Sequence, residues 1–140
     1  MRPARGSTPQ GWVGKTGAVL LVDAANVVGS RPTGWWRDRP GAARAFVERL
    51  RAASVADKLD GAVVVVLEGA ARGGVEEGVV GRVSVLHSPG SGDDTLIAVA
   101  GDAVEQVTLV SADRALRQRA EALGARLASP GWLIDLLDTC

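Results

Sequence analysis

The amino-acid sequence predicts an α/β protein whose parallel sheet is covered by helices on both faces. Two observations support this prediction. Short apolar segments of strand length alternate along the chain with segments of helical periodicity. The strand segments are also apolar throughout instead of alternating with polar residues, which is typical of strands buried on both faces. Such strands belong to parallel sheets with crossover helices on each side.

Five segments have the length and composition of strands. The second of them, AVVVVL, is a continuous run rich in β-branched residues, as expected for a central parallel strand. A short Gly-rich link separates the second strand from the third and is interpreted as a loop. The predicted strands are Ala18–Val22, Ala62–Leu67, Arg82–Leu86, Val107–Val110 and Ala125–Ala128.

Four segments between or after these strands carry helix signals. Pro40 stands at a first-turn position, and Ser91 with Asp94 three residues later has the pattern of a capping box. Gly124 ends the third helix, and Ser129 followed by proline begins the fourth. The predicted helices cover residues 41–59, 93–104, 112–123 and 131–138.

The chain of 140 residues has the length of one domain. Residues 1–17 are rich in Gly, Pro, Ser and Arg and predict a flexible lead-in, so the domain is expected over residues 18–140. The formal net charge is zero, which argues against nucleic-acid binding by bulk charge but leaves local basic patches open. A single cysteine and no apolar run of about 20 residues predict a cytoplasmic protein that does not span a membrane.

Acidic side chains follow four of the predicted strands closely. They are Asp23, Glu68, Asp93, Asp94 and Asp113. In open parallel sheets, ligands bind beyond the carboxyl ends of the strands, so these acids are expected at one edge. Converging carboxylates repel one another unless a cation lies among them. Oxygen-rich sites with few imidazoles suit Mg²⁺ or Mn²⁺, and we expect one of these ions here.

These residues resemble the motifs of the PIN-like nuclease superfamily, and most closely those of its NYN branch. The matching pieces, in the family's order, are VDAAN (Asp23, Asn26), Glu68, DDTLIA (Asp94) and VSADR (Ser111, Asp113). The resemblance implies a three-layer α/β/α sandwich with a five-stranded parallel sheet of order 3-2-1-4-5. It also implies a divalent-metal site and hydrolysis of phosphodiester bonds, usually in RNA. At Glu68 this chain departs from relatives that often carry Asp.

The resemblance and the strand positions together predict the roles of the acids. The expected catalytic residues are Asp23, Glu68, Asp94 and Asp113, and the expected metal ligands are Asp23, Asp94 and Asp113, with Asp93 as the adjacent alternative. Asn26 is expected to orient Asp23, and Ser111 to support Asp113 by hydrogen bonding. Simpler interpretations remain for each acid: a turn residue at Asp23, a helix cap at Asp94 or Asp113, and a loop acid at Glu68.

A loop between the first strand and the first helix, SRPTGWWRDRPG, is the densest arginine and aromatic stretch of the chain. Arginine pairs with phosphate through two parallel hydrogen bonds, and an exposed indole can stack on an unpaired base. Alternatively, the tryptophans pack beneath the loop as a small second core. The predicted substrate-binding residues are Arg31, Trp35, Trp36, Arg37, Arg39 and Arg114.

The sequence thus favours a metal-dependent ribonuclease acting on single-stranded RNA, and it leaves a homodimer open. One alternative is a PIN-like module that binds RNA or a protein without cutting it. Another is a metal-dependent phosphate-handling enzyme of a different α/β family. A phosphatase of the haloacid-dehalogenase type is disfavoured because Ala25 stands where its Asp-x-Asp motif needs the second acid.

Overall fold

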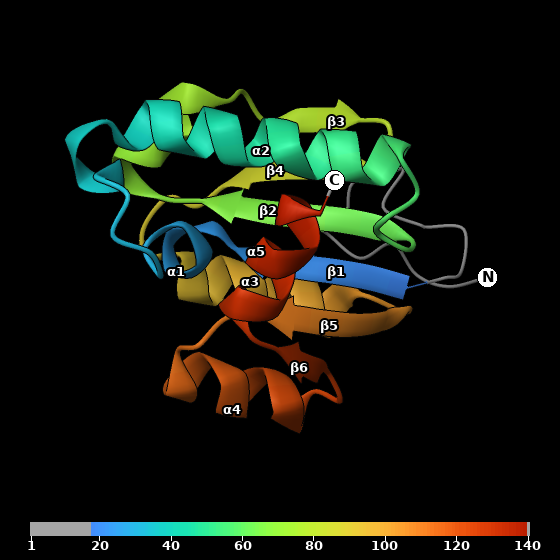
Figure 1. Cartoon of the computed structure of the whole chain (residues 1–140). Coiled ribbons are helices and arrows are strands. Elements are labelled where there is room, and N and C mark those ends of the chain that lie inside the picture. The colour runs from blue at the N-terminus through green and yellow to red at the C-terminus, as the bar shows by residue number, and fades with distance from the viewer. Residues whose placement is uncertain (1–17, 140) are drawn as a thin grey trace.

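The structure is a computed structural model that describes residues 18–139; the predicted lead-in of residues 1–17 lies outside this range. Strands and helices alternate along the chain, as the sequence predicts (Figure 1). The strands are β1 (Ala18–Asp23), β2 (Ala62–Leu67), β3 (Gly78–Val80), β4 (Val83–His87), β5 (Gln106–Val110) and β6 (Arg126–Ala128). The α-helices are α1 (Ala24–Val28), α2 (Arg39–Val55), α3 (Gly92–Asp102), α4 (Arg114–Ala122) and α5 (Pro130–Asp138). Two 3₁₀ turns, η1 (Trp35–Arg37) and η2 (Gly69–Gly74), lie in the loops.

The six strands form one sheet in the order β3-β4-β2-β1-β5-β6. Every neighbouring pair is parallel except β3 with β4. Without β3, the order is the one expected for a five-stranded sheet, with the first strand in the middle. The predicted fold class, a three-layer α/β/α sandwich with a parallel sheet in this strand order, is therefore confirmed.

The additional strand β3 corrects the prediction that the link after the second strand is only a loop. Its three residues are all exposed and begin with glycine, so neither length nor polarity pattern marks them as a strand. They become one because they pair antiparallel with Val83–Val85 of β4. This short strand covers the edge of the parallel sheet.

Helices cover both faces of the sheet (Figure 1). Side chains of α1, α2 and α5 pack on one face together with Leu20 and Val22 of β1. Side chains of α3 and α4 pack on the other face together with Val19 and Leu21. Burial from both sides explains why the strands read as uninterrupted apolar runs. Within the described residues no helix is both long and apolar enough to cross a lipid bilayer.

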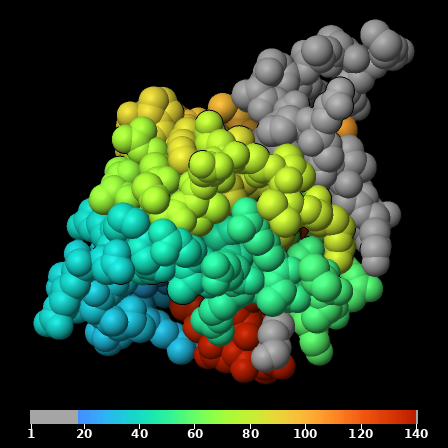
Figure 2. All heavy atoms as spheres, turned by 90° about the horizontal axis from the view of Figure 1, so that it is seen from above, coloured from blue at the N-terminus to red at the C-terminus, as the bar shows by residue number. Residues whose placement is uncertain are grey.

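The turn η2 lies against α2, as the view from above in Figure 2 shows. The Arg44 Nε donates a 3.1 Å hydrogen bond to the carbonyl oxygen of Gly74. A Cβ atom at Gly74 would collide with the carbonyl oxygen of Pro40, whereas one at Gly73 would lie 3.9 Å from the Pro40 Cγ. Only glycine at position 74 therefore allows η2 to approach the start of α2 this closely.

We expect Gly74→Ala to lower the free energy of unfolding by about 1–3 kcal/mol, because backbone atoms have to move apart to admit the methyl group. Gly73→Ala is the matched control and is expected to leave stability unchanged or slightly higher, since its methyl group meets only an ordinary contact. Urea denaturation of the two variants measures this difference. Equal stability of the two proteins would show that η2 is not fixed against α2.

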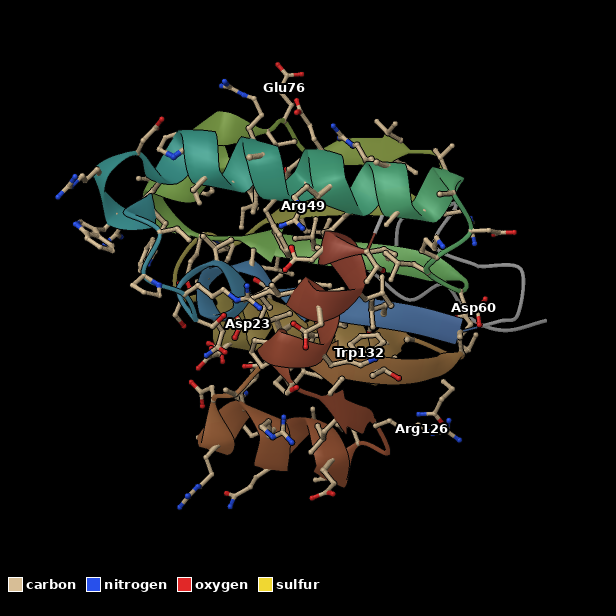
Figure 3. The ribbon with its side chains drawn as sticks, viewed as in Figure 1. Asp23, Arg49, Asp60, Glu76, Arg126 and Trp132 are labelled. Atoms are coloured by element: carbon tan, nitrogen blue, oxygen red, sulfur yellow. The ribbon has the colours of Figure 1, made fainter. Side chains whose placement is uncertain are left out.

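The carboxyl ends of the central strands lie at one edge of the sheet. The register pairs Asp23 of β1 with Val66 of β2, so Glu68 follows two residues later at the same edge. Val22 pairs with the last residue of β5, which places Ser111 beside Asp23. Figure 3 shows Asp23 at this edge and Asp60 at the opposite end of the sheet.

Candidate active site

Asp23 is the last residue of β1 and the most deeply placed acid at the carboxyl edge. It is only 7% exposed. Its carboxylate accepts a 2.9 Å hydrogen bond from the Ser111 hydroxyl and a 3.4 Å hydrogen bond from the backbone N–H of Asn26. The second bond makes Asp23 the N-cap of α1. The end of β1 and the start of α1 thus fix the direction of the Asp23 carboxylate.

The surroundings of Asp23 shift its proton affinity. Burial raises the pKa of Asp23 above its ordinary value, and the hydrogen bonds from Ser111 and Asn26 oppose this by stabilising the ionised form. The negative charges of Asp93 and Glu68 raise the pKa of Asp23 further. The structure therefore brings three carboxylates, those of Asp23, Glu68 and Asp93, into electrostatic reach of one another.

Ser111 and Asn26 connect Asp23 to the loop between β5 and α4. Ser111 is fully buried, and its Oγ accepts a 3.1 Å hydrogen bond from the backbone N–H of Asp113. The Asn26 Oδ1 accepts a 2.8 Å hydrogen bond from the backbone N–H of Ala112. These bonds hold the loop against the end of β1, so both side chains stand where a supporting role requires them.

Glu68 holds the start of α3. Its Oε2 accepts a 3.0 Å hydrogen bond from the backbone N–H of Gly92, the first residue of that helix. The capping box predicted for Ser91 and Asp94 is wrong, because the Ser91 side chain makes no capping hydrogen bond. An acid from the end of β2 supplies the cap instead, which satisfies an otherwise unpaired helix N–H and favours negative charge there.

The two adjacent acids of α3 face in different directions. The Asp94 side chain is 87% exposed and forms a 3.3 Å ion pair with Arg119 of α4. Asp93 is partly buried and contributes to the electrostatic field at Asp23. Helical spacing predicts this difference. Leu96 and Ala100 are buried on the sheet, and Asp93 precedes them by three and seven residues, so it lies on the same face of α3.

Asp113 begins α4. Its Oδ1 accepts a 3.0 Å hydrogen bond from the backbone N–H of Leu116, which makes it the N-cap of that helix. Asp113 is linked to Asp23 through the Ser111 hydroxyl. Arg114 follows it and is exposed at the first helical position. The assignments of Asp94 and Asp113 as metal ligands stay predictions.

The arginine and tryptophan loop is ordered by contacts among its own side chains. The rings of Trp35 and Trp36 meet edge to face, with centroids 6.2 Å apart. The guanidinium of Arg37 lies 5.9 Å from the Trp36 ring centroid, and that of Arg39 lies 5.2 Å from the Trp35 centroid. Trp36 is 51% exposed and Trp35 is half-buried, so the two tryptophans do not form a closed second core.

Arg31 of the same loop is turned toward α5 instead. Its guanidinium forms ion pairs of 3.2 Å with Asp135 and 3.5 Å with Asp138. Both partners are exposed, and such surface pairs contribute little stability. The assignment of Arg31 to substrate binding stays a prediction, and binding by it would require these contacts to open.

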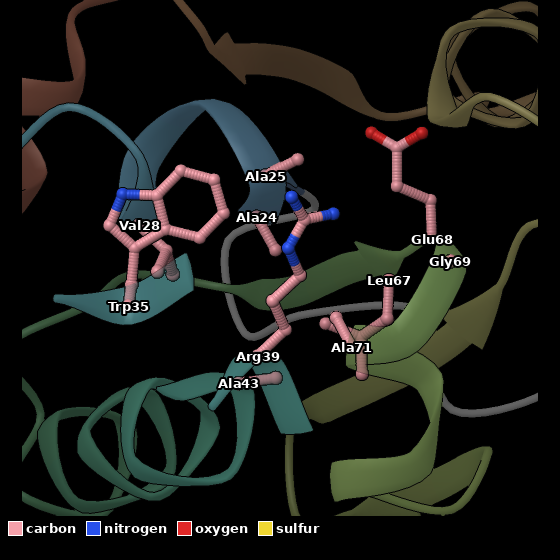
Figure 4. Close-up of a pocket in the computed structure, with 10 residues that line it drawn as sticks. All are labelled: Ala24, Ala25, Val28, Trp35, Arg39, Ala43, Leu67, Glu68, Gly69 and Ala71. Carbon is pink, nitrogen blue, oxygen red and sulfur yellow. The ribbon is translucent and has the colours of Figure 1, made fainter. Parts of the chain in front are cut away.

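A pocket of about 190 Å³ opens beside Glu68, between η1, α1, α2 and η2 (Figure 4). No sequence pattern indicates this pocket, because side chains far apart in the chain, many of them small, create it. In the view of Figure 4, the Arg39 guanidinium lies between the Trp35 indole and the Glu68 carboxylate. The residues that line the pocket include Ala24, Val28, Trp35, Arg39, Leu67 and Glu68.

The acidic edge offers only oxygen donors to a metal. Among residues 18–139, no three His, Cys, Asp or Glu side chains form a ready-made metal cage. Magnesium is commonly held by one or two carboxylates, with water and substrate phosphate oxygens as the other ligands. The carboxylates of Asp23, Glu68 and Asp93 fit this incomplete kind of site. They suit Mg²⁺ or Mn²⁺ better than metals that prefer sulfur or imidazole.

Comparison with known proteins gives a match at the level of the fold. No family model and no curated protein matches the sequence. The structure is similar to the crystal structure of the W164L mutant of Rae1 (YacP) from Bacillus subtilis, with a TM-score of 0.68 and 18% sequence identity. The match covers 87% of this chain and 76% of the other. The two proteins share a fold.

Proposed function

We propose that the protein is a divalent-metal-dependent nuclease that hydrolyses phosphodiester bonds in RNA, related to the NYN branch of PIN-like nucleases. The observation that supports this best is the buried carboxylate of Asp23, which lies at the carboxyl edge of the sheet in the field of Glu68 and Asp93. The motif resemblance, which includes Asp23 and the DDTLIA segment that contains both Asp93 and Asp94, and the shared fold with Rae1 are consistent with it.

Electrostatics explains why these acids would bind a cation. A carboxylate that is buried beside two others is destabilised in its ionised form by desolvation and by like-charge repulsion. A bound divalent cation would reduce both costs, because it would replace lost hydration and offset most of the negative charge of the cluster. Folding alone does not require such a cost at the edge where parallel sheets bind ligands. We therefore assign Asp23, Glu68 and Asp93 to cation binding.

In the proposed reaction, the chain's own residues position the cation and the substrate. When bound, a divalent cation would supply a water of lowered pKa and would offset negative charge on the phosphate. The Ser111 hydroxyl holds one oxygen of Asp23, and Asn26 holds the adjoining loop, so the carboxylate keeps one orientation. A protein nucleophile is not required. His87 already uses its Nε2 in a 2.7 Å hydrogen bond with the carbonyl oxygen of Val75.

RNA would be bound by the loop that follows α1. Arg37 and Arg39 are exposed cations next to tryptophan rings, and Trp36 presents half of its surface to solvent. This combination suits a single strand, because phosphates pair with arginine while unpaired bases stack on aromatic faces. Arg114, exposed at the start of α4, would extend the basic surface on the other side of Asp23.

A non-cutting RNA-binding module is the second candidate. It is favoured by one observation, namely that the described residues hold no three acids arranged as a metal cage. Such a module would keep the arginine and tryptophan loop but would not need the acidic edge. The two candidates therefore differ in whether a divalent metal binds and in whether RNA is cut.

We expect the purified protein to cleave generic single-stranded RNA when Mn²⁺ or Mg²⁺ is present and to lose this activity when EDTA removes the metal, because the proposed water activation depends on the cation. Gel separation of the end-labelled products measures the cleavage. Calorimetry with Mn²⁺ alone provides a readout independent of turnover. RNA binding without metal binding or cleavage would instead identify the protein as the non-cutting module.

A further inference from the structure

We propose that the pocket beside Glu68 binds one unpaired base of the RNA, next to the phosphate that is cut. This inference deepens the proposed nuclease function, on which it rests, by assigning a base-binding subsite and thereby a requirement for an unpaired nucleotide. The pocket adjoins the acidic edge because Glu68 belongs to both.

The walls of the pocket suit a flat ring system. Ala24, Val28 and Leu67 supply apolar surface, while Trp35 and Arg39 supply planar groups. Unpaired bases in RNA complexes stack on aromatic rings and on guanidinium planes. The guanidinium of Arg39 lies 5.2 Å from the Trp35 ring centroid, so the two planar groups are close together in the pocket.

The charges of the pocket favour a base over a phosphate. Arg39 carries hydrogen-bond donors, whereas Glu68 carries an acceptor carboxylate within the same lining. A phosphate would meet the negative charge of Glu68, but the edge of a base presents donors and acceptors together. The volume of about 190 Å³ is small compared with the roughly 300–1,000 Å³ of sites for larger ligands. A single ring system is therefore the fitting occupant, and a paired base is too large.

The position of the pocket relates it to the scissile phosphate. Ala24 and Ala25 follow Asp23 directly in the chain, and Glu68 lines the pocket while acting on Asp23 through its charge. A nucleotide whose base enters the pocket would thus place its own phosphate near the acids. RNA with that nucleotide held in a duplex cannot enter, so cleavage is expected to be confined to single-stranded positions.

The test fills the pocket without touching the acids. Ala71 lines the pocket, whereas its neighbour Ala70 in the same turn is exposed and lies outside the lining. Ala71→Leu is therefore the pocket-filling variant and Ala70→Leu its matched control. Ala25→Leu, on the exposed side of α1, fills the pocket from another wall and serves if Ala71→Leu folds poorly in a thermal melt.

RNA binding is measured by fluorescence anisotropy with EDTA present. The probes are a short single-stranded RNA and a series of the same RNA in which one abasic site is placed at each position in turn. We expect Ala71→Leu to weaken binding of the intact RNA about tenfold, in line with the loss of one stacked base, and Ala70→Leu to leave it unchanged. One abasic position should weaken wild-type binding to a similar extent and have no further effect in Ala71→Leu.

The outcomes separate this inference from the nuclease proposal. Equal affinity of the Ala71→Leu and Ala70→Leu proteins, or an abasic series without a sensitive position, would overturn the base pocket even if the wild type cuts RNA. The base pocket would also be overturned if the wild-type protein did not bind the RNA in EDTA. Absence of cleavage with Mn²⁺, together with the expected binding pattern, would overturn the nuclease and leave the base pocket in place.

Discussion

Asp23→Asn is expected to reduce metal-dependent cleavage of single-stranded RNA by at least about a thousandfold, a loss of the size seen when a central catalytic group is removed. The amide keeps the shape of the side chain and an oxygen for the Asn26 N–H. It loses the negative charge that, together with those of Glu68 and Asp93, is proposed to bind the cation. Calorimetry should also show weaker Mn²⁺ binding, because an amide oxygen is a poorer partner for a divalent ion.

The same substitution is expected to raise the free energy of unfolding of the metal-free protein by about 0.5–2 kcal/mol, the usual gain when a strained functional position is relaxed. Its pH dependence follows from the raised pKa of Asp23. The folded protein binds the proton of the Asp23 carboxyl more tightly than the unfolded chain does. The free energy of unfolding of the wild type therefore falls as pH rises from the ordinary pKa of 3.8 through the higher pKa of the folded state. The variant lacks this decline, and its advantage should therefore grow over that pH range.

Asp60→Asn is the control for both measurements, because Asp60 is exposed at the opposite end of the sheet (Figure 3). We expect this variant to cleave RNA and to unfold like the wild type. Wild-type cleavage by the Asp23→Asn protein would remove the basis of the nuclease proposal. A variant that is inactive but also markedly less stable would mean that the charge of Asp23 supports the fold instead.

The second prediction with a large expected effect distinguishes the roles of the adjacent carboxylates of Asp93 and Asp94. Asp93→Asn is expected to lower cleavage and Mn²⁺ affinity by at least about a hundredfold, since even the loss of an outer partner of a metal ligand costs about 10–100-fold. Asp94→Asn is expected to stay within about threefold of the wild type. Its side chain is 87% exposed, and its ion pair with Arg119 is a surface pair worth about 0–1 kcal/mol.

These two variants control each other, because they change neighbouring residues of the same helix by the same substitution. Thermal melts are expected to agree to within a few degrees. The reverse pattern, with Asp94→Asn inactive and Asp93→Asn active, would establish Asp94 as the ligand and would require the first turn of α3 to rotate when the metal binds. Loss of activity in both variants would mean that both acids take part.

The parallel sheet could be predicted because its strands are buried on both faces, and AVVVVL has no other ready interpretation. The smaller elements could not. The strand β3 depends on its antiparallel partner β4, since Val79 and Val80 are exposed and carry no pattern of their own. The short helix α1 was likewise absent from the prediction, because five residues capped by Asp23 look like the turn that ends a strand.

At the site, the sequence indicated which acids reach the carboxyl edge but not how each one is turned. Glu68 caps α3 through a hydrogen bond to Gly92, 24 positions later in the chain, so local capping rules could not find it. The choice between Asp93 and Asp94 depends on the rotation of α3 about its axis, which the packing of Leu96 and Ala100 determines. Spacing from those two residues favours Asp93, an indication that the capping-box interpretation obscured.

The hydrogen bond between Ser111 and Asp23 joins residues 88 positions apart, and β5 lies directly beside β1. Ribosomes add about 5–20 residues per second, and domains fold as they emerge. A nascent chain that ends at α3 already contains Asp23, Glu68 and Asp93, but it lacks the neighbouring strand that completes the sheet around them. In the proposed nuclease, the acidic edge would therefore stay incomplete beside the messenger RNA being read until nearly the whole domain has been translated.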